Sequence, residues 1–223
     1  MAISLYSANN ANGLGTSWHC NYSAPYGAVL VVFVGTNNNG TSYLSGVTAN
    51  GVSMTEVAVD DANPPGDQFC FFLGNPPATG SGQVTVSFSG DTGAGGGICA
   101  LVFQNSNNEE AAAGDIRPGG VTHNTNSTVL SLTTVTNNAV IVTSSTSSGG
   151  GGITVPTGYT SAVATFADGQ AKSMAAAYSP AIATAGSQSL TWTFGDIQSA
   201  STAVALSPGS FPGLPNGTFM VSD

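Results

Sequence analysis

Basic side chains are almost absent from this chain. Arg117 and Lys172 are the only strong bases among 223 residues, against 11 acidic residues, and the formal net charge is −9. Contacts of Lys and Arg with phosphates supply most of the affinity of nucleic-acid-binding proteins, and the same side chains hold proteins on anionic membrane surfaces. Two isolated bases supply neither, so we expect no nucleic-acid partner and no membrane partner.

Charge of either sign is scarce, at 6% of the residues. The solubility of the protein must therefore rest on Asn, Ser, Thr and Gly, a composition typical of extracellular and virion-surface proteins. The first ten residues have no basic segment followed by an apolar one, so we expect no signal peptide. The longest apolar run, 28–34, is far too short to span a membrane.

Cysteine is also rare. Cys20, Cys70 and Cys99 are an odd number of thiols, widely separated, and each lies within a strand-like run. We expect them to be small buried side chains of a protein made in a reducing cytoplasm, with a disulfide between two of them as the alternative.

Helical periodicity is absent, and short runs rich in Val, Phe, Tyr and Thr recur between Gly, Pro and Asn clusters. The sequence therefore predicts an all-β fold. The predicted strands are 17–23, 28–35, 45–49, 52–59, 68–73, 83–89 and 98–104 in the first half, and 128–134, 139–145, 159–166, 173–178, 189–194 and 202–206 in the second.

The chain shows an internal repeat. The run Ala28–Val34 has a counterpart in Ala139–Thr143, and the segment from Phe72 to Phe88 has one in the segment from Ala177 to Phe194. The offset is about 105 residues, the length of a small β-sandwich. We expect a jelly-roll-like sandwich with an internal duplication, in which the two copies share a core.

The repeat suggests a domain organisation. We predict one domain, 1–208, in which repeat 1 is about 17–104, a linker is 105–126, and repeat 2 is about 127–208. A loop as long as this linker is usually functional or an interaction segment. Residues 209–223 form a C-terminal tail.

Two patterns predict local structure and burial. Asn50-Gly51 supplies the two positive φ angles of a type I′ hairpin turn, which places Ala49 opposite Val52, and Val47 opposite Met54, on one face. Strict alternation predicts two half-buried strands. Their core-facing residues are Val84, Val86, Phe88, Leu190, Trp192 and Phe194.

No catalytic or cofactor-binding motif is present in the sequence. The glycine run 93–97 lacks a lysine and leads into a strand, so it is not a phosphate-binding loop. His19 and Cys20 are neighbours on a predicted strand and should point to opposite faces. His123 lies in the polar linker, where we expect it to be solvated. We therefore expect no enzyme activity and no cofactor.

Two weaker site candidates remain. Asp60, Asp61 and Asp67 offer hard oxygen ligands for calcium, although they lack the spacing of a helix–loop–helix calcium loop. We expect no metal and interpret this cluster as a solvated loop tip, with a calcium site as the alternative. Phe69, Phe71, Phe72 and Leu73 predict a central strand covered on both faces, with an aromatic sugar-binding platform as the alternative.

Three motifs resemble those of a loose group of β-sandwich proteins found in phage virion modules and on bacterial surfaces. They are the valine-rich hairpin within 45–57, the aromatic strand ending in Asn75-Pro76-Pro77, and Val84–Gly90. The resemblance covers about 28–206. It implies a jelly-roll-like sandwich displayed on a particle or surface, and it brings no catalytic residues.

These observations predict a non-enzymatic phage virion structural protein, made in the host cytoplasm and located on the outer surface of the head as a decoration protein. The alternatives are a phage tail or fibre component and a secreted carbohydrate-binding or surface adhesion module. The expected partners are a capsid or tail protein and further copies of the chain, in a homo-oligomer such as a trimer.

The tail contains the most apolar irregular segment. Pro212 and Pro215 restrict its backbone, which lowers the entropy cost of ordering it on a partner. We expect it to contact a neighbouring subunit, and the alternative is that it covers an edge strand of its own sandwich. The expected anchors are Phe211, Leu214, Phe219 and Met220.

Overall fold

The computed structural model describes residues 2–36, 44–60, 67–77, 80–90, 95–114, 126–147, 151–167, 173–195 and 199–209. Within these ranges the protein is all-β, and no helix could span a membrane. The first half contains β1 (Ser4–Gly13), β2 (Ser17–Ala24), β3 (Val29–Thr36), β4 (Leu44–Ala49), β5 (Val52–Ser53), β6 (Thr55–Asp60), β7 (Gln68–Gly74), β8 (Gly80–Phe88) and β9 (Gly96–Gln104). The second half contains β10 (Ser106–Gly114), β11 (Ser127–Thr134), β12 (Val140–Ser147), β13 (Ile153–Thr154), β14 (Thr160–Ala167), β15 (Ser173–Tyr178), β16 (Gly186–Phe194) and β17 (Ser199–Pro208).

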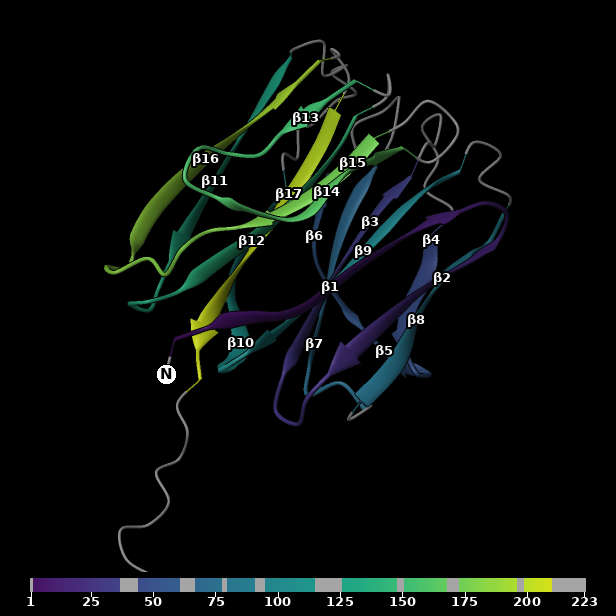
Figure 1. The fold of residues 1–223 in the computed structure, drawn as a ribbon, viewed down its shortest axis with the longest axis horizontal. Helices are drawn as coiled ribbons and strands as arrows, with labels where there is room; N and C mark the ends of the chain where they lie inside the picture. Colours follow the sequence, from purple (N-terminus) through teal and green to yellow (C-terminus); the bar gives the residue numbers. More distant parts are fainter. Residues whose placement is uncertain are drawn as a thin grey trace, which may run out of the picture.

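The strands form four antiparallel sheets. Inner sheet 1 has the order β1-β9-β3-β7-β6, and outer sheet 1 has the order β2-β8-β4-β5. Inner sheet 2 has the order β10-β17-β12-β15-β14, and outer sheet 2 has the order β11-β16-β13. Figure 1 shows the four sheets as successive layers, from outer sheet 2 at the upper left to outer sheet 1 at the right, with the two inner sheets between them.

Three apolar cores hold these layers together. One lies between outer and inner sheet 1 and contains Trp18 and Phe71. A second lies between the two inner sheets and contains Phe33 and Phe103. The third lies between inner and outer sheet 2 around Trp192. Each half is therefore a complete two-sheet sandwich, and the core that the halves share lies between them.

The two halves have the same strand order. To compare them, the strands of each half are counted from its first strand, β1 or β10, and β5 and β6 count as one strand. Both inner sheets then have the order first, eighth, third, sixth, fifth. Both outer sheets begin with the second, seventh and fourth strands. This is the strand order of a jelly roll, in which two Greek keys close a double sheet.

The inner sheets pack on each other reciprocally. β3 contacts its counterpart β12, β1 contacts β14 while β6 contacts β10, and β9 contacts β15 while β7 contacts β17. These contacts relate equivalent strands as a two-fold interface does. The match is partial, because β17 also contacts β6 more extensively than β9 contacts β14.

Both ends of the described chain lie at one end of the stack. The Gly209 N–H donates to the Asn105 carbonyl oxygen at 2.7 Å, and the Asn105 side-chain amide donates to the Ala2 carbonyl oxygen at 3.0 Å. The opposite end is formed by the last residues of β3 and β12, where Thr36 pairs with Gly96 and Ser147 pairs with Ser199.

Every predicted strand is present, and the hairpin is confirmed. Asn50 and Gly51 have φ values of 47° and 80°, Ala49 pairs with Val52, and the Met54 N–H donates to the Val47 carbonyl oxygen. Val52 is exposed, whereas the other three apolar residues of the hairpin are buried. The predicted strand 52–59 is in fact two strands, because the chain leaves outer sheet 1 at Met54 and enters inner sheet 1 as β6.

The prediction of a loop over the whole linker 105–126 is wrong, because its first part is β10. β1 was likewise not predicted as a strand. Both are edge strands of inner sheets, and each bonds along its length to a single neighbour, β17 or β9. Main-chain bonds to one neighbour require little apolar alternation, so sequences such as Ser4–Gly13 carry no strand signal.

Candidate functional site

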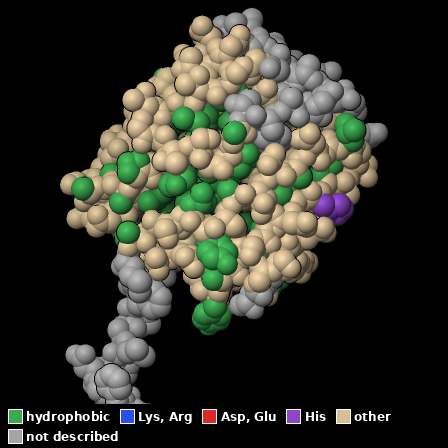
Figure 2. Space-filling model, viewed as in Figure 1, with side chains coloured by type: hydrophobic (Ala, Val, Ile, Leu, Met, Phe, Trp, Pro, Cys, Tyr) green, Lys and Arg blue, Asp and Glu red, His purple; other side chains and the backbone are tan. Residues whose placement is uncertain are grey.

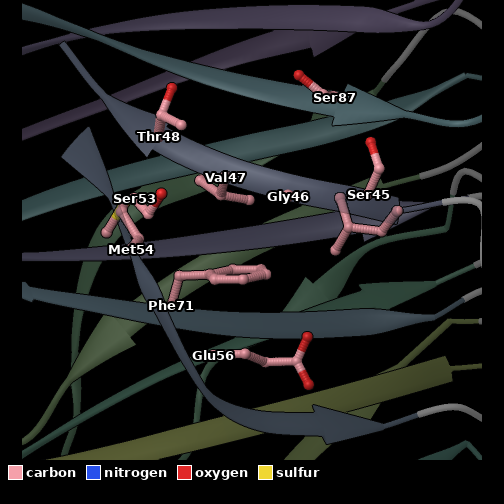
Figure 3. Close-up of a pocket in the computed structure, with 10 residues that line it drawn as sticks. Ser45, Gly46, Val47, Thr48, Ser53, Met54, Glu56, Phe71 and Ser87 are labelled. Carbon is pink, nitrogen blue, oxygen red and sulfur yellow. The ribbon is translucent and has the colours of Figure 1, made fainter. Parts of the chain in front are cut away.

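A groove of about 520 Å³ lies at the open edge of the first sandwich. Residues of outer sheet 1, of the β5–β6 junction and of β7 line it (Figure 3). The lining residues are Leu44, Ser45, Gly46, Val47, Thr48, Ser53, Met54, Glu56, Phe71 and Ser87.

The groove exists because the chain changes sheets. β5 pairs with β4 only at Thr48 and Ala49, and the chain then crosses to inner sheet 1. The two sheets therefore separate at this edge, and side chains of the core form the floor between them. Phe71 and Met54 lie there, 4% and 8% exposed, and hydroxyl groups such as that of Ser45 lie around them.

Among the described residues that line the groove, Glu56 contributes the one acidic side chain. Partial burial raises the pKa of this carboxyl above its usual value, because desolvation disfavours the charged form. General acid–base catalysis requires a donor and an acceptor positioned at a reacting group. The described lining offers one carboxylate among hydroxyl and apolar groups, an arrangement suited to binding a neutral ligand.

A second, smaller hollow of about 320 Å³ lies where β1 meets β2 and β8. Its side chains are uncharged amides and one imidazole, from Asn9, Asn10, His19, Asn21 and Gln83. The His19 ring lies 3.2 Å from the Thr85 hydroxyl, and the Gln83 amide donates to the Asn21 side-chain oxygen at 3.4 Å. These contacts occupy part of the hydrogen-bonding capacity of the hollow.

The predicted separation of His19 and Cys20 is confirmed. His19 is exposed on the outer face of β2, and Cys20 is buried on the inner face. All three cysteines are free and buried, as expected. Burial raises the pKa of Cys20 to about 11 and raises those of Cys70 and Cys99 well above the usual range, so these thiols are poor nucleophiles.

The expectation that the aspartate cluster is a solvated loop tip is wrong for Asp60 and Asp67. Both are buried at the ends of β6 and β7, and the Ser201 N–H donates to the Asp60 carboxylate at 2.8 Å across the two halves. Asp61 lies outside the described residues. Within the described ranges, no three His, Cys, Asp or Glu side chains are grouped so that they could hold a metal ion.

The aromatic strand is a central strand, and a sugar platform on it is excluded. Phe69 and Phe71 face the first core, Phe72 faces the core between the inner sheets, and all three are buried. The exposed large aromatic side chains of the described residues are Tyr6 and Tyr26, which lie on β1 and in the turn after β2.

Several predicted site residues lie outside the described residues. They are Asp61 and the tail anchors Phe211, Leu214, Phe219 and Met220, and His123, which we expect to be solvated, also lies outside these ranges. The groove beside β4 was not predicted. The sequence carries only a weak signal for it, because the alternation of Val52 and Met54 breaks at Glu56, just after the chain changes sheets.

Comparisons with known proteins find no family that matches the chain and no curated relative. Among solved structures, the subviral particle of infectious bursal disease virus VP2 is 10% identical, with a TM-score of 0.24, over 93% of this chain and 42% of that one. A deletion mutant of the Bacillus subtilis oxalate decarboxylase OxdC is 8% identical, with a TM-score of 0.20, over 92% of this chain and 74% of that one. The chain thus spans about two fifths of the viral protein, and similarity at this level does not establish a family.

Proposed function

We propose that this protein is a non-enzymatic structural protein of a phage virion and that it decorates the outer surface of the head. The observation that carries the proposal is the chemistry of the two outer sheets. Apart from Val52 and Val129, which are exposed, the solvent faces of their described residues carry polar side chains without Asp, Glu, Lys or Arg. These are Ser17, His19, Asn21, Ser81, Gln83 and Thr85 on outer sheet 1, and Ser131, Thr133, Ser187, Ser189, Thr191 and Thr193 on outer sheet 2.

A neutral hydrated face suits the outside of a particle. It has no basic groups to bind phosphates, so it gives the protein no reason to lie beside the genome. No charged side chain is visible among the described residues on the face in Figure 2, and its apolar side chains lie mainly between the layers. Such a surface supports a role in display or protection rather than in chemistry.

We also infer that the two halves arose by internal duplication. The repeated strand order and the reciprocal packing of the inner sheets support this origin. A single sandwich that paired through its inner sheet would bury the same apolar face that the two halves bury here. Fusion of two copies would then keep that interface while freeing the second copy to change.

The location is tested on intact particles of the phage that encodes the protein. Immunogold labelling with an antibody against the folded protein should mark the heads, and deletion of the gene should leave DNA-filled heads that lose their DNA at a lower temperature. Gold on the tails would replace the head assignment with the tail alternative. Absence of the protein from purified particles would refute the virion proposal.

Assembly through the tail is part of this proposal. We expect the chain to form a homo-oligomer, such as a trimer, or to dock on a capsid protein through residues 210–223. Deletion of these residues should give a soluble monomer with an unchanged melting temperature that no longer assembles. A deletion variant that assembles normally, or that unfolds, would contradict the assignment.

A further inference from the structure

β4 has an unpaired edge next to the groove. β8 pairs with β4 from Leu44 to Ala49, whereas β5 pairs with it only at Thr48 and Ala49. The Met54 N–H then donates to the Val47 carbonyl oxygen, after which the chain leaves the sheet. Within the described residues, the segment 44–46 therefore has a strand neighbour on one side only. Such an edge is a template for the backbone of another strand.

The groove has room for that strand. Leu44, Ser45 and Gly46 all line the groove, so the edge that they form borders open space. Side chains of an added strand alternate between two faces. One set would reach the apolar floor formed by Phe71 and Met54, and the other would point to solvent (Figure 3).

The sequence beyond Gly209 contains a segment that fits these requirements. Thr218–Ser222 has no proline, glycine or charged residue, and alternation places Phe219 and Val221 on the same face. The described lining of the groove offers one carboxylate, that of Glu56, and no basic side chain to pair with an acidic strand. A neutral apolar strand therefore suits the groove better than an acidic one does.

Inner sheet 1 is complete at its β9 edge without the tail, because β1 pairs with β9 there. After β9 the chain passes Asn105 and enters the opposite inner sheet as β10. The equivalent route after β17 leads into inner sheet 1 at the place that β1 already fills, next to β9. The tail is therefore not needed to complete that sheet, and it remains available to a neighbour.

We propose that residues 218–222 of one copy add as a strand to the 44–46 edge of β4 in a second copy, with Phe219 and Val221 on the Phe71–Met54 floor. The inference rests on the assembly proposed above and names its docking site. A tail of one copy in a groove of the next is a head-to-tail contact, which closes into a ring such as a trimer when the rotation permits.

A cross-linking experiment between two different copies tests the contact. Copy 1 lacks residues 210–223 and carries Ser45→Cys, and copy 2 is the full chain with Thr218→Cys. Mild oxidation should link copy 1 to copy 2, since the three native thiols are buried and do not compete. The matched control is copy 1 with His19→Cys, which exposes a thiol on the outer face of the same sheet and should not be linked.

A full chain that carries both Ser45→Cys and Thr218→Cys separates the two directions of docking. Links between chains support the proposal. Links only within one chain show that the tail covers its own groove, which overturns it. Copy 1 that is linked no better than its His19→Cys control also overturns it.

A peptide of residues 210–223 gives an independent readout by fluorescence anisotropy. It should bind the tail-deleted protein, and Phe219→Asp in the peptide should weaken binding by at least about tenfold. Equal binding of the two peptides refutes the docking. If the full chain forms oligomers without these signals, the inference fails while assembly stands. If the signals appear but the protein is absent from virions, the proposed function fails instead.

Discussion

The two halves of the molecule have one strand order but different cores. The first sandwich is filled by large side chains, with Trp18, Tyr22, Phe69, Phe71 and Phe88 between its sheets. In the second, Trp192 and Phe194 are the buried aromatic residues, and β15 and β17 supply alanines. The same topology is therefore compatible with two different ways of filling the space between sheets.

The third strand of each half shows how the core of the second sandwich, around Trp192, is stabilised. β3 is apolar up to Val34, whereas β12 continues from Val142 as Thr-Ser-Ser-Thr-Ser, and both strands are fully buried. The hydroxyl of Thr143 donates to the Thr202 carbonyl oxygen at 2.8 Å, and that of Ser145 donates to the Ala200 carbonyl oxygen at 2.9 Å. A buried hydroxyl with a partner costs little. Hydrogen bonds thus replace side-chain volume in β12.

The tryptophans should give the largest effects. Trp18 lies 4.5 Å from Phe88 between ring centroids, and Trp192 is completely buried. We expect Trp18→Ala and Trp192→Ala each to lower the free energy of unfolding by about 3–5 kcal/mol. Urea denaturation measures this, and the exposed His19→Ala should change it by less than about 0.5 kcal/mol. A loss below about 1 kcal/mol for Trp192→Ala would mean that the core of the second sandwich is not organised around this residue.

Glycine at position 96 makes room for Trp18 in the first half. A Cβ on Gly96 would meet the Gly35 carbonyl oxygen and the Trp18 ring. We expect Gly96→Ala to destabilise the protein by about 1–3 kcal/mol through overpacking. Gly46→Ala is the matched control, because open space surrounds that position, and it should change the melting temperature very little. Equal effects of the two variants would contradict the tight fit.

Exchanging Thr and Val at equivalent positions of the two halves tests whether a hydrogen-bonded hydroxyl and a methyl group can replace each other in these cores. Thr143 occupies in β12 the place of Val32 in β3, and the Trp192 indole N–H donates to its hydroxyl at 3.0 Å. Thr143→Val leaves that N–H without its partner, and Val32→Thr buries a hydroxyl in an apolar core. We expect each variant to lose about 1–3 kcal/mol of stability. If Thr143→Val leaves the free energy of unfolding unchanged, then side-chain shape, and not hydrogen bonding, stabilises the core of the second sandwich.

Glu56, in the groove of the first half, should give the smallest effect. Desolvation raises the pKa of this carboxyl in the folded protein above its ordinary value of 4.5. The folded state therefore binds the proton more tightly than the unfolded state does, so ionisation of Glu56 lowers stability as pH rises through these values. We expect Glu56→Gln to raise the melting temperature slightly near pH 7 and less so near pH 4. A larger gain near pH 4 would contradict this sign.

Much of the fold was predictable, because the alternation of apolar and polar residues in a strand indicates which of its side chains are buried. The rows Val84/Val86/Phe88 and Leu190/Trp192/Phe194 are buried as their alternation predicts, on the equivalent strands β8 and β16. The edge strands β1 and β10 were not predictable, since backbone bonds to a single neighbour define them. The groove was missed for a related reason. It depends on β5 and β6 pairing in different sheets, which the local sequence around Met54 does not specify.

The position of β17 determines how the molecule carries load. The strand that ends beside Gly209 pairs with β10 on one side and with β12 on the other, along most of its length. Antiparallel ladder bonds run perpendicular to the strands, so a force applied through the chain beyond Gly209 along the strand direction loads many of these bonds together. A protein tethered by its C-terminal end would therefore resist mechanical unfolding by shear, whereas a pull across the sheet would open the bonds one at a time.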